Sequence, residues 1–103
     1  MKVTRHANKR IRERMGLNKK SVDNIAALAL EKGLKQSETT GRLRKYMNYL
    51  YYSHVTANNI RLYSQKVFIF HNTILITVFK LPNEYIKAFN KLSERKKELR
   101  NAS

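Results

Sequence analysis

Cysteine is absent from the 103 residues, and there are only three glycines and one proline. Without cysteine the chain has no disulfides, thiolate metal sites or cysteine nucleophiles. The low glycine and proline content argues against low complexity or disorder away from the ends. No window approaches the roughly 18 apolar residues of a membrane span, and the basic N-terminus leads into more charge. These absences predict a soluble cytoplasmic protein with no membrane partner.

Acidic side chains are also scarce, with 7 Asp and Glu against 22 Lys and Arg, which gives a formal net charge of +15. Self-repulsion at that excess costs stability, so a polyanionic partner is expected. Nucleic acid is the first candidate, and an anionic membrane surface or an acidic protein is the second. The length fits one domain with a single core, residues 1–103.

Residues 60–82 are dense in β-branched and aromatic side chains and are interrupted by polar pairs at 64–65 and 71–72. This pattern predicts a meander of three antiparallel strands joined by two-residue loops. Pairing across those loops, without a bulge, places Lys66 directly opposite Thr77. The register therefore brings a cation and a hydroxyl together.

Alternation along these strands gives the predicted sheet two unlike faces. One face is aliphatic and must be buried, and it holds Ile60, Leu62, Val67, Ile69, Ile74, Ile76 and Val78. The other face holds Arg61, Tyr63, Lys66, Phe68, Phe70, Leu75, Thr77 and Phe79. It suits base stacking and phosphate binding, with Arg61, Tyr63, Lys66 and Phe68 as nucleic-acid contacts. The alternative is a second core face with two snorkelling cations.

Helical patterns cover residues 3–15, 18–32 and 42–52 before the sheet and begin again at Asn83 after it. Thr4 is the expected cap of the first helix, and Gly16 is its expected end. The chain is therefore predicted to be an α+β domain, with N-terminal helices packed on one face of a small antiparallel β-meander and a C-terminal helix following. Residues 93–103 are charged on all sides and either extend the last helix or fray.

The third predicted helix carries the densest mixture of rings and cations in the chain: Arg42, Arg44, Lys45, Tyr46, Tyr49, Tyr51 and Tyr52. Tyrosines at helical spacing serve either as core and rim residues or as platforms for bases. The sequence leaves both interpretations open.

Metal and cofactor chemistry has little support, because metal-ligand motifs and glycine-rich phosphate loops are missing. What remains is metal-independent attack of an RNA 2′-hydroxyl on the neighbouring phosphate. That reaction needs a proton acceptor and donor, usually histidine, together with cations on the transition-state charge. His6, with Arg10 one turn further on and Arg14 along the same flank, supplies these groups. On the sheet, Arg61 and Lys66 would bind phosphate.

The opening RHANKRIRERMGLNKKSVDNIAALALEKG, with the later NNIRLYSQKVFIF and ILITVFKLP, resembles a family of small, largely uncharacterised proteins from phages and prophages of Gram-positive bacteria. Its first part more distantly resembles the histidine-alanine-x-x-arginine helix of BrnT-like toxins. These belong to the RelE and barnase-like group of small α+β ribonucleases. In this resemblance, the helix motif of the toxins corresponds to His6, Ala7, Arg10 and Arg14. Their last-strand motif corresponds to Thr77. It implies RNA, more than DNA, as a partner in a bacterial host cell.

Three hypotheses follow from the sequence. The first is a phage-associated endoribonuclease with His6, Arg10 and Thr77 as catalytic residues and Thr77 orienting the phosphate. The second is a non-catalytic DNA- or RNA-binding protein that uses the same basic surface. The third is an inhibitor that binds a host or defence protein through that surface. All three need cationic surface, so charge alone does not separate them.

Overall fold

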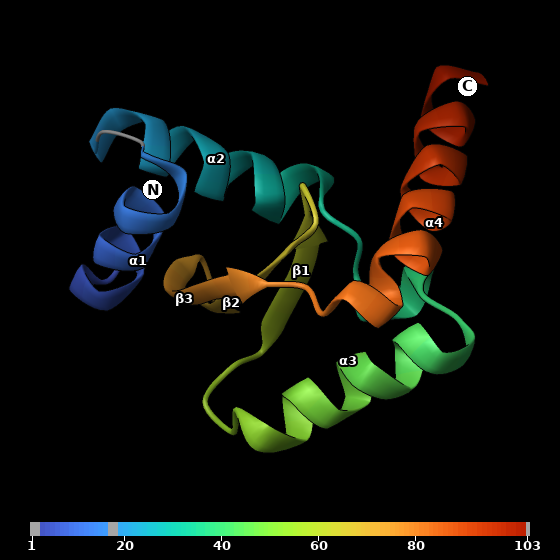
Figure 1. The fold of residues 1–103 in the computed structure, drawn as a ribbon, viewed down its shortest axis with the longest axis horizontal. Helices are drawn as coiled ribbons and strands as arrows, with labels where there is room; N and C mark the ends of the chain where they lie inside the picture. The colour runs from blue at the N-terminus through green and yellow to red at the C-terminus, as the bar shows by residue number, and fades with distance from the viewer. Residues whose placement is uncertain (1–2, 17–18, 103) are drawn as a thin grey trace.

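The computed structural model describes residues 3–16 and 19–102 (Figure 1). The elements are α1 (Arg5–Met15), α2 (Lys19–Lys32), a 3-10 turn η1 (Gln36–Glu38), α3 (Gly41–Ser53), β1 (Asn59–Tyr63), β2 (Lys66–His71), β3 (Ile74–Lys80) and α4 (Asn83–Ala102). The predicted α+β fold is confirmed, with helices before a three-stranded antiparallel sheet and one helix after it. The expected cap of α2, residue 18, lies outside the described residues.

The ends of α1 follow the local signals in the sequence. The Thr4 hydroxyl accepts a hydrogen bond from the Ala7 N–H at 3.2 Å, as an N-cap does. Gly16 has a φ of 63° and donates its N–H to the Arg12 carbonyl at 3.0 Å, which ends the helix. The charged C-terminal segment extends α4 to Ala102, and Figure 1 shows this part projecting away from the sheet.

The first hairpin has the predicted register. Ser64 and Gln65 have φ values of 52° and 61°, the left-handed conformation that a tight two-residue hairpin needs. Tyr63 therefore lies opposite Lys66. The hairpin is also joined to the last helix, because the Gln65 amide donates to the Asn90 side-chain oxygen at 3.3 Å.

The second hairpin differs from the prediction. Its loop lies one residue later, so that His71 pairs with Ile74, and a β-bulge follows at Ile76. Lys66 consequently lies opposite Lys80, and the predicted pairing of Lys66 with Thr77 was wrong. A bulge adds one residue to one strand and turns every later side chain to the other face.

The N-terminal segment holds the bulge in place. The Thr4 N–H donates to the Leu75 carbonyl at 2.8 Å, and the Thr4 hydroxyl donates to the Ile76 carbonyl at 2.9 Å. Val3 also forms a parallel bridge with Leu75. At the opposite edge, Leu34 and Leu62 exchange backbone hydrogen bonds of 2.8 and 3.0 Å. Both edge strands are thus partly paired, which limits edge-to-edge association.

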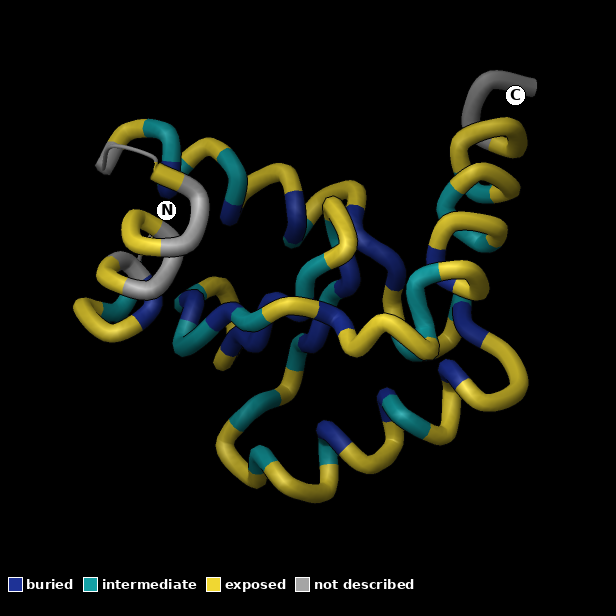
Figure 2. Tube along the Cα trace, in the orientation of Figure 1, coloured by how far each residue is buried: buried dark blue, intermediate teal, exposed yellow. Residues whose placement is uncertain are grey.

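Helices cover both faces of the sheet, and Figure 2 shows the buried positions turned inward. One core cluster joins the sheet to α1 and α2 and contains Ala7, Val22, Ala26, Ala29, Phe68, Phe70, Leu75 and Val78. The other joins it to α3 and α4 and contains Leu34, Leu43, Met47, Leu50, Ile60, Leu62, Val67, Ile69, Leu81 and Phe89. The prediction that the sheet face with the aromatic residues is open to solvent was therefore wrong. The alternative, that this face forms a second core, is confirmed. No helix in the described part of the chain is long and apolar enough to cross a bilayer.

Candidate nucleic-acid interface

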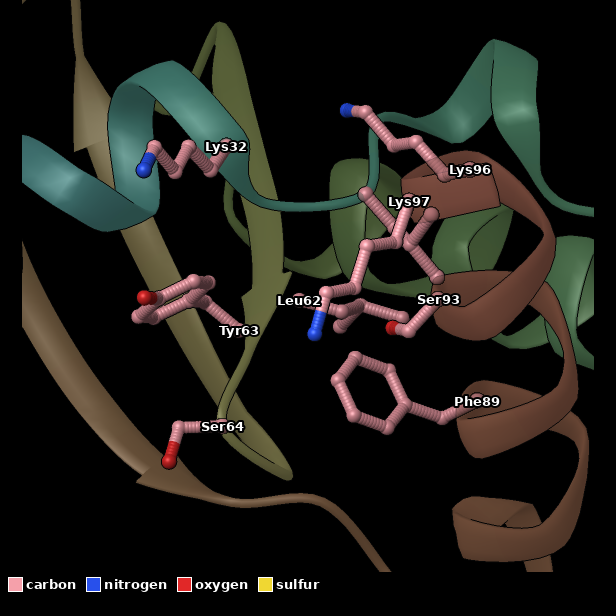
Figure 3. Close-up of a pocket in the computed structure, with 9 residues that line it drawn as sticks. Lys32, Leu62, Tyr63, Ser64, Phe89, Ser93, Lys96 and Lys97 are labelled. Carbon is pink, nitrogen blue, oxygen red and sulfur yellow. The ribbon is translucent and has the colours of Figure 1, made fainter. Parts of the chain in front are cut away.

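A groove of ≈ 770 Å³ lies where the end of β1 meets the end of α2 and the middle of α4 (Figure 3). It is lined by Lys32, Leu34, Leu62, Tyr63, Ser64, Phe89, Ser93, Lys96 and Lys97. Three lysines, two aromatic residues and two serines line it, together with two leucines. This combination suits a ligand with both anionic and flat apolar parts.

The groove is formed by one side of α4 and by the close contact of the end of α2 with β1. Phe89, Ser93 and Lys97 fall at i, i+4 and i+8 of α4, so they share one side of that helix. The end of α2 reaches the sheet at Gly33, where an added Cβ would lie 2.9 Å from the Arg61 Cβ and 2.4 Å from a backbone oxygen of α2. Only glycine permits this contact, which brings Lys32 next to Tyr63.

Lys96 has a structural role, and we call its contacts with Glu38 and Gly33 the latch. Its ammonium donates to a Glu38 carboxylate oxygen at 2.9 Å and to the Gly33 carbonyl at 3.0 Å, and its side chain is only 19% exposed. The Lys35 N–H donates to the same carboxylate oxygen at 2.9 Å. Burial alone would raise the pKa of Glu38, but the hydrogen bonds from Lys96 and Lys35 and their charges lower it overall. The latch fastens α4 to the connector after α2.

Lys32 and Lys97 are the exposed cations of the groove. Within the described residues neither ammonium forms an ion pair or a hydrogen bond, since the ion pairs there involve Lys96 and Arg42. Figure 3 shows Lys97 extending into the space between α4 and β1, whereas Lys96 turns toward the connector. The charges of Lys32 and Lys97 are therefore available to an anionic ligand.

A row of side chains continues from the groove across the sheet. Tyr63, Lys66 and Lys80 occupy paired positions on β1, β2 and β3, so all three project from the same face. Lys66 is half-buried and Lys80 is exposed. Directly opposed residues have Cβ atoms roughly 4.5–5.5 Å apart, and like charges at that distance repel. We call Lys32, Lys97, Tyr63, Lys66 and Lys80 the basic track.

Among the residues predicted to act in RNA cleavage, the structure does not bring Thr77 and Lys66 together. His6 is exposed on α1, and the side chains of Arg10 and Arg14 lie outside the described residues. Thr77 pairs with Ile69 and projects from the face opposite to that of Lys66. No group of three or more metal-binding side chains occurs in the described part of the chain. The predicted pairing of Lys66 with Thr77 is therefore absent, and the catalytic role of His6 and Arg10 stays a prediction.

Two of the predicted nucleic-acid contacts have structural roles. Phe68 is fully buried between the sheet and α1 and α2, so it cannot stack on a base, and its prediction as a contact was wrong. Arg61 is half-buried and donates to the carbonyls of Leu30 and Ile60 at 3.4 and 3.3 Å. It thus holds the end of α2 against β1. Tyr63 lines the groove, and its ring makes an edge contact with Phe68.

The sequence interpretation missed Lys32, Lys80 and Lys97. Lys97 belongs to the segment that sequence analysis left as either a charged helix end or a frayed tail. Its i+4 and i+8 spacing from Ser93 and Phe89 was the signal that could have found it. Lys80 had no comparable signal, because it is aligned with Lys66 only by the shifted loop and the bulge together.

No protein-family model matches the chain, and neither the curated proteins nor the solved structures include a significantly similar one. The resemblance to phage proteins and ribonuclease-like toxins therefore stays a prediction.

Proposed function

We propose that the protein binds nucleic acid along the basic track without cleaving it. The observation that carries this proposal is that Lys32 and Lys97 line one groove with the half-buried ring of Tyr63, which is itself paired across the sheet with Lys66 and Lys80. The net charge of +15 adds a long-range attraction for any polyanion. Phosphates would lie on the lysines, while the groove takes up a sugar or a base.

The chemistry of the groove favours nucleic acid over a purely ionic partner. An acidic peptide would satisfy the lysines, but it would leave the half-buried ring of Tyr63 without a flat partner. Nucleic acids present phosphates and planar bases together, and proteins bind them with cationic grooves and aromatic side chains. That RNA is proposed ahead of DNA as the ligand rests only on the resemblance of the first helix to the ribonuclease-like toxins.

A double substitution tests the track. Lys32→Gln with Lys97→Gln removes two exposed charges from the groove, and Lys20→Gln with Lys91→Gln removes two exposed charges from the same helices outside it. Binding of a labelled RNA strand would be followed by fluorescence anisotropy over a range of salt concentrations. We expect the groove variant to bind at least about tenfold more weakly and its salt slope to fall by about 1.4.

The control variant distinguishes binding at a defined site from general electrostatic attraction to the charged protein. If both double variants lose affinity and slope equally, the protein binds polyanions through its total charge and the basic track is not a site. If neither RNA nor DNA is bound, the proposal fails. Nuclease-resistant capture of a defined host or defence protein would then favour the inhibitor hypothesis.

A further inference from the structure

The outer side of α3 carries a second group of cations and rings. Arg42, Lys45, Tyr49 and Tyr52 fall at i, i+3, i+7 and i+10, so they lie along one side of the helix. We call these four residues the tyrosine face. Tyr49 is 63% exposed and Tyr52 is 85% exposed, whereas Leu43, Met47 and Leu50 on the opposite side of α3 are buried.

A hollow of ≈ 400 Å³ borders this face, and it is lined by Arg42, Lys45, Tyr46, Tyr49 and Tyr85. The rings of Tyr46 and Tyr85 stack there with centroids 4.5 Å apart and planes at 22°. Burial raises the pKa of Tyr46 above its ordinary value, and a hydrogen bond with Glu84 raises that of Tyr85. Phenols are neutral near pH 7 in any case, and the raised pKa values of these two keep them so at higher pH, so the stacked pair forms an uncharged wall.

The other tyrosines of α3 have packing roles. The Tyr51 hydroxyl accepts the Ile60 N–H at 2.8 Å, and Tyr46 stacks on Tyr85. The side chains of Tyr49 and Tyr52 make no hydrogen bond or ring contact within the described residues. Packing thus accounts for Tyr46 and Tyr51, and leaves two large exposed rings beside two cations.

We infer that the tyrosine face binds the bases of single-stranded nucleic acid. Bases stack on Tyr49 and Tyr52, whose Cα atoms are about 4.5 Å apart along the helix axis at 1.5 Å per residue. The Lys45 ammonium and the outer part of Arg42, about one and two turns before Tyr49, meet the phosphates that lead up to the stacked bases. Arg42 is only loosely held by Glu84, at 3.9 Å, so it remains able to turn toward a phosphate.

Single strands fit this face better than duplexes. In a duplex the bases are stacked on each other, and protruding rings reach them only after unstacking, whereas an open strand offers its base faces directly. The tyrosine face is also separate from α2, because α3 and α2 pack on opposite sides of the sheet. The inference rests on the proposed function in that both surfaces bind nucleic acid, but it adds a second surface and a preference.

The test compares Tyr49→Ala with Tyr52→Ala in one variant against Tyr49→Phe with Tyr52→Phe in another. Both variants lose the phenol hydroxyls, but only the alanine variant loses the rings. The ligands are an oligouridine strand and an RNA duplex of equal phosphate number. We expect the alanine variant to lose roughly tenfold or more in affinity for the strand and less than about twofold for the duplex. The phenylalanine variant keeps its affinity for both.

The intrinsic tyrosine fluorescence supplies a second readout, since the chain has six tyrosines and no tryptophan. Oligouridine should quench the wild-type emission by stacking, and the alanine variant should show a smaller quench at saturation. Circular dichroism and a thermal melt show that each variant is folded. Equal losses for strand and duplex, or no loss for either, would overturn the inference.

The two proposals fail in different ways. If the wild type binds oligouridine and weakens on loss of Lys32 and Lys97, but not on loss of the rings, only the tyrosine face is refuted. If the wild type binds neither ligand, the proposed function is refuted as well. If loss of the rings abolishes binding of a protein partner and leaves oligouridine binding unchanged, the face is a protein-docking surface and the inference is overturned.

Discussion

Lys66 on β2 lies directly opposite Lys80 on β3, and within the described residues neither ammonium has a carboxylate partner. A like-charge pair at this spacing costs roughly 0.2–1 kcal/mol relative to a neutral pair. The cost disappears when a phosphate lies between the two ammonium groups. This pair therefore links the stability of the free protein to its affinity for a polyanion.

Replacing Lys80 with glutamate should separate the two properties. Lys80→Glu converts the repulsion into a cross-strand ion pair, so we expect the free energy of unfolding in urea to rise by about 0.5 kcal/mol. The affinity for RNA should fall by about tenfold or more. Lys80→Gln serves as the control, with a smaller effect in each direction. A more stable Lys80→Glu protein that binds RNA as well as the wild type would place the ligand elsewhere.

Removal of the Lys96 ammonium should destabilise the fold. Lys96→Met keeps much of the apolar stem but leaves Glu38 and the Gly33 carbonyl without their donor, so we expect a loss of about 1.5–3 kcal/mol in urea unfolding. The matched Lys97→Met substitution removes an exposed charge from the next position of α4. It should change stability by less than about 0.5 kcal/mol. Equal effects of the two substitutions would refute the latch.

The latch also predicts a dependence of stability on pH. The pKa of Glu38 is lowered in the folded protein, so its ionised form stabilises the fold at any pH above the ordinary glutamate pKa of about 4.3. This contribution is lost as the pH falls through the lowered pKa and the carboxyl group becomes protonated. Urea unfolding from pH 7 to pH 3 should show a steeper decline for the wild type than for Glu38→Gln. Parallel curves would contradict the assignment.

His6 distinguishes binding from cleavage. Because Thr77 and Lys66 project from opposite faces of the sheet, we expect the purified protein to leave a mixed RNA intact in EDTA. His6→Ala should bind RNA with the wild-type affinity. Cleavage by the wild type that disappears in His6→Ala would restore the ribonuclease hypothesis.

The sequence predicted correctly the ends of the first helix and the first hairpin turn, which depend on residues close together in the chain. Thr4 and Gly16 end α1 as expected, and the pair Ser64 and Gln65 makes the first hairpin turn. The bulge at Ile76 was missed because its hydrogen bond comes from Thr4, 72 residues earlier in the chain. The shifted loop already separated Thr77 from Lys66 along the strands, and the bulge then turned Thr77 to the opposite face, which removed the predicted pairing.

The candidate site was less predictable than the fold. Its groove is formed by side chains from α2, β1 and α4, which no single stretch of sequence brings together. The predicted open face of the sheet carried the right chemistry, cations beside rings, but Phe68 and Phe70 on it are covered by α1 and α2. Two helices on each side of a three-stranded sheet cover both of its faces.

The most direct measurement is a titration of the isotopically labelled protein with a short RNA strand, followed by amide chemical shifts. The basic track predicts large changes at Lys32, Tyr63, Lys66, Lys80 and Lys97, beside those expected at the tyrosine face of α3, with small changes along α1. Changes confined to α1 around His6, or spread evenly over all exposed lysines, would contradict a binding site at the end of the sheet.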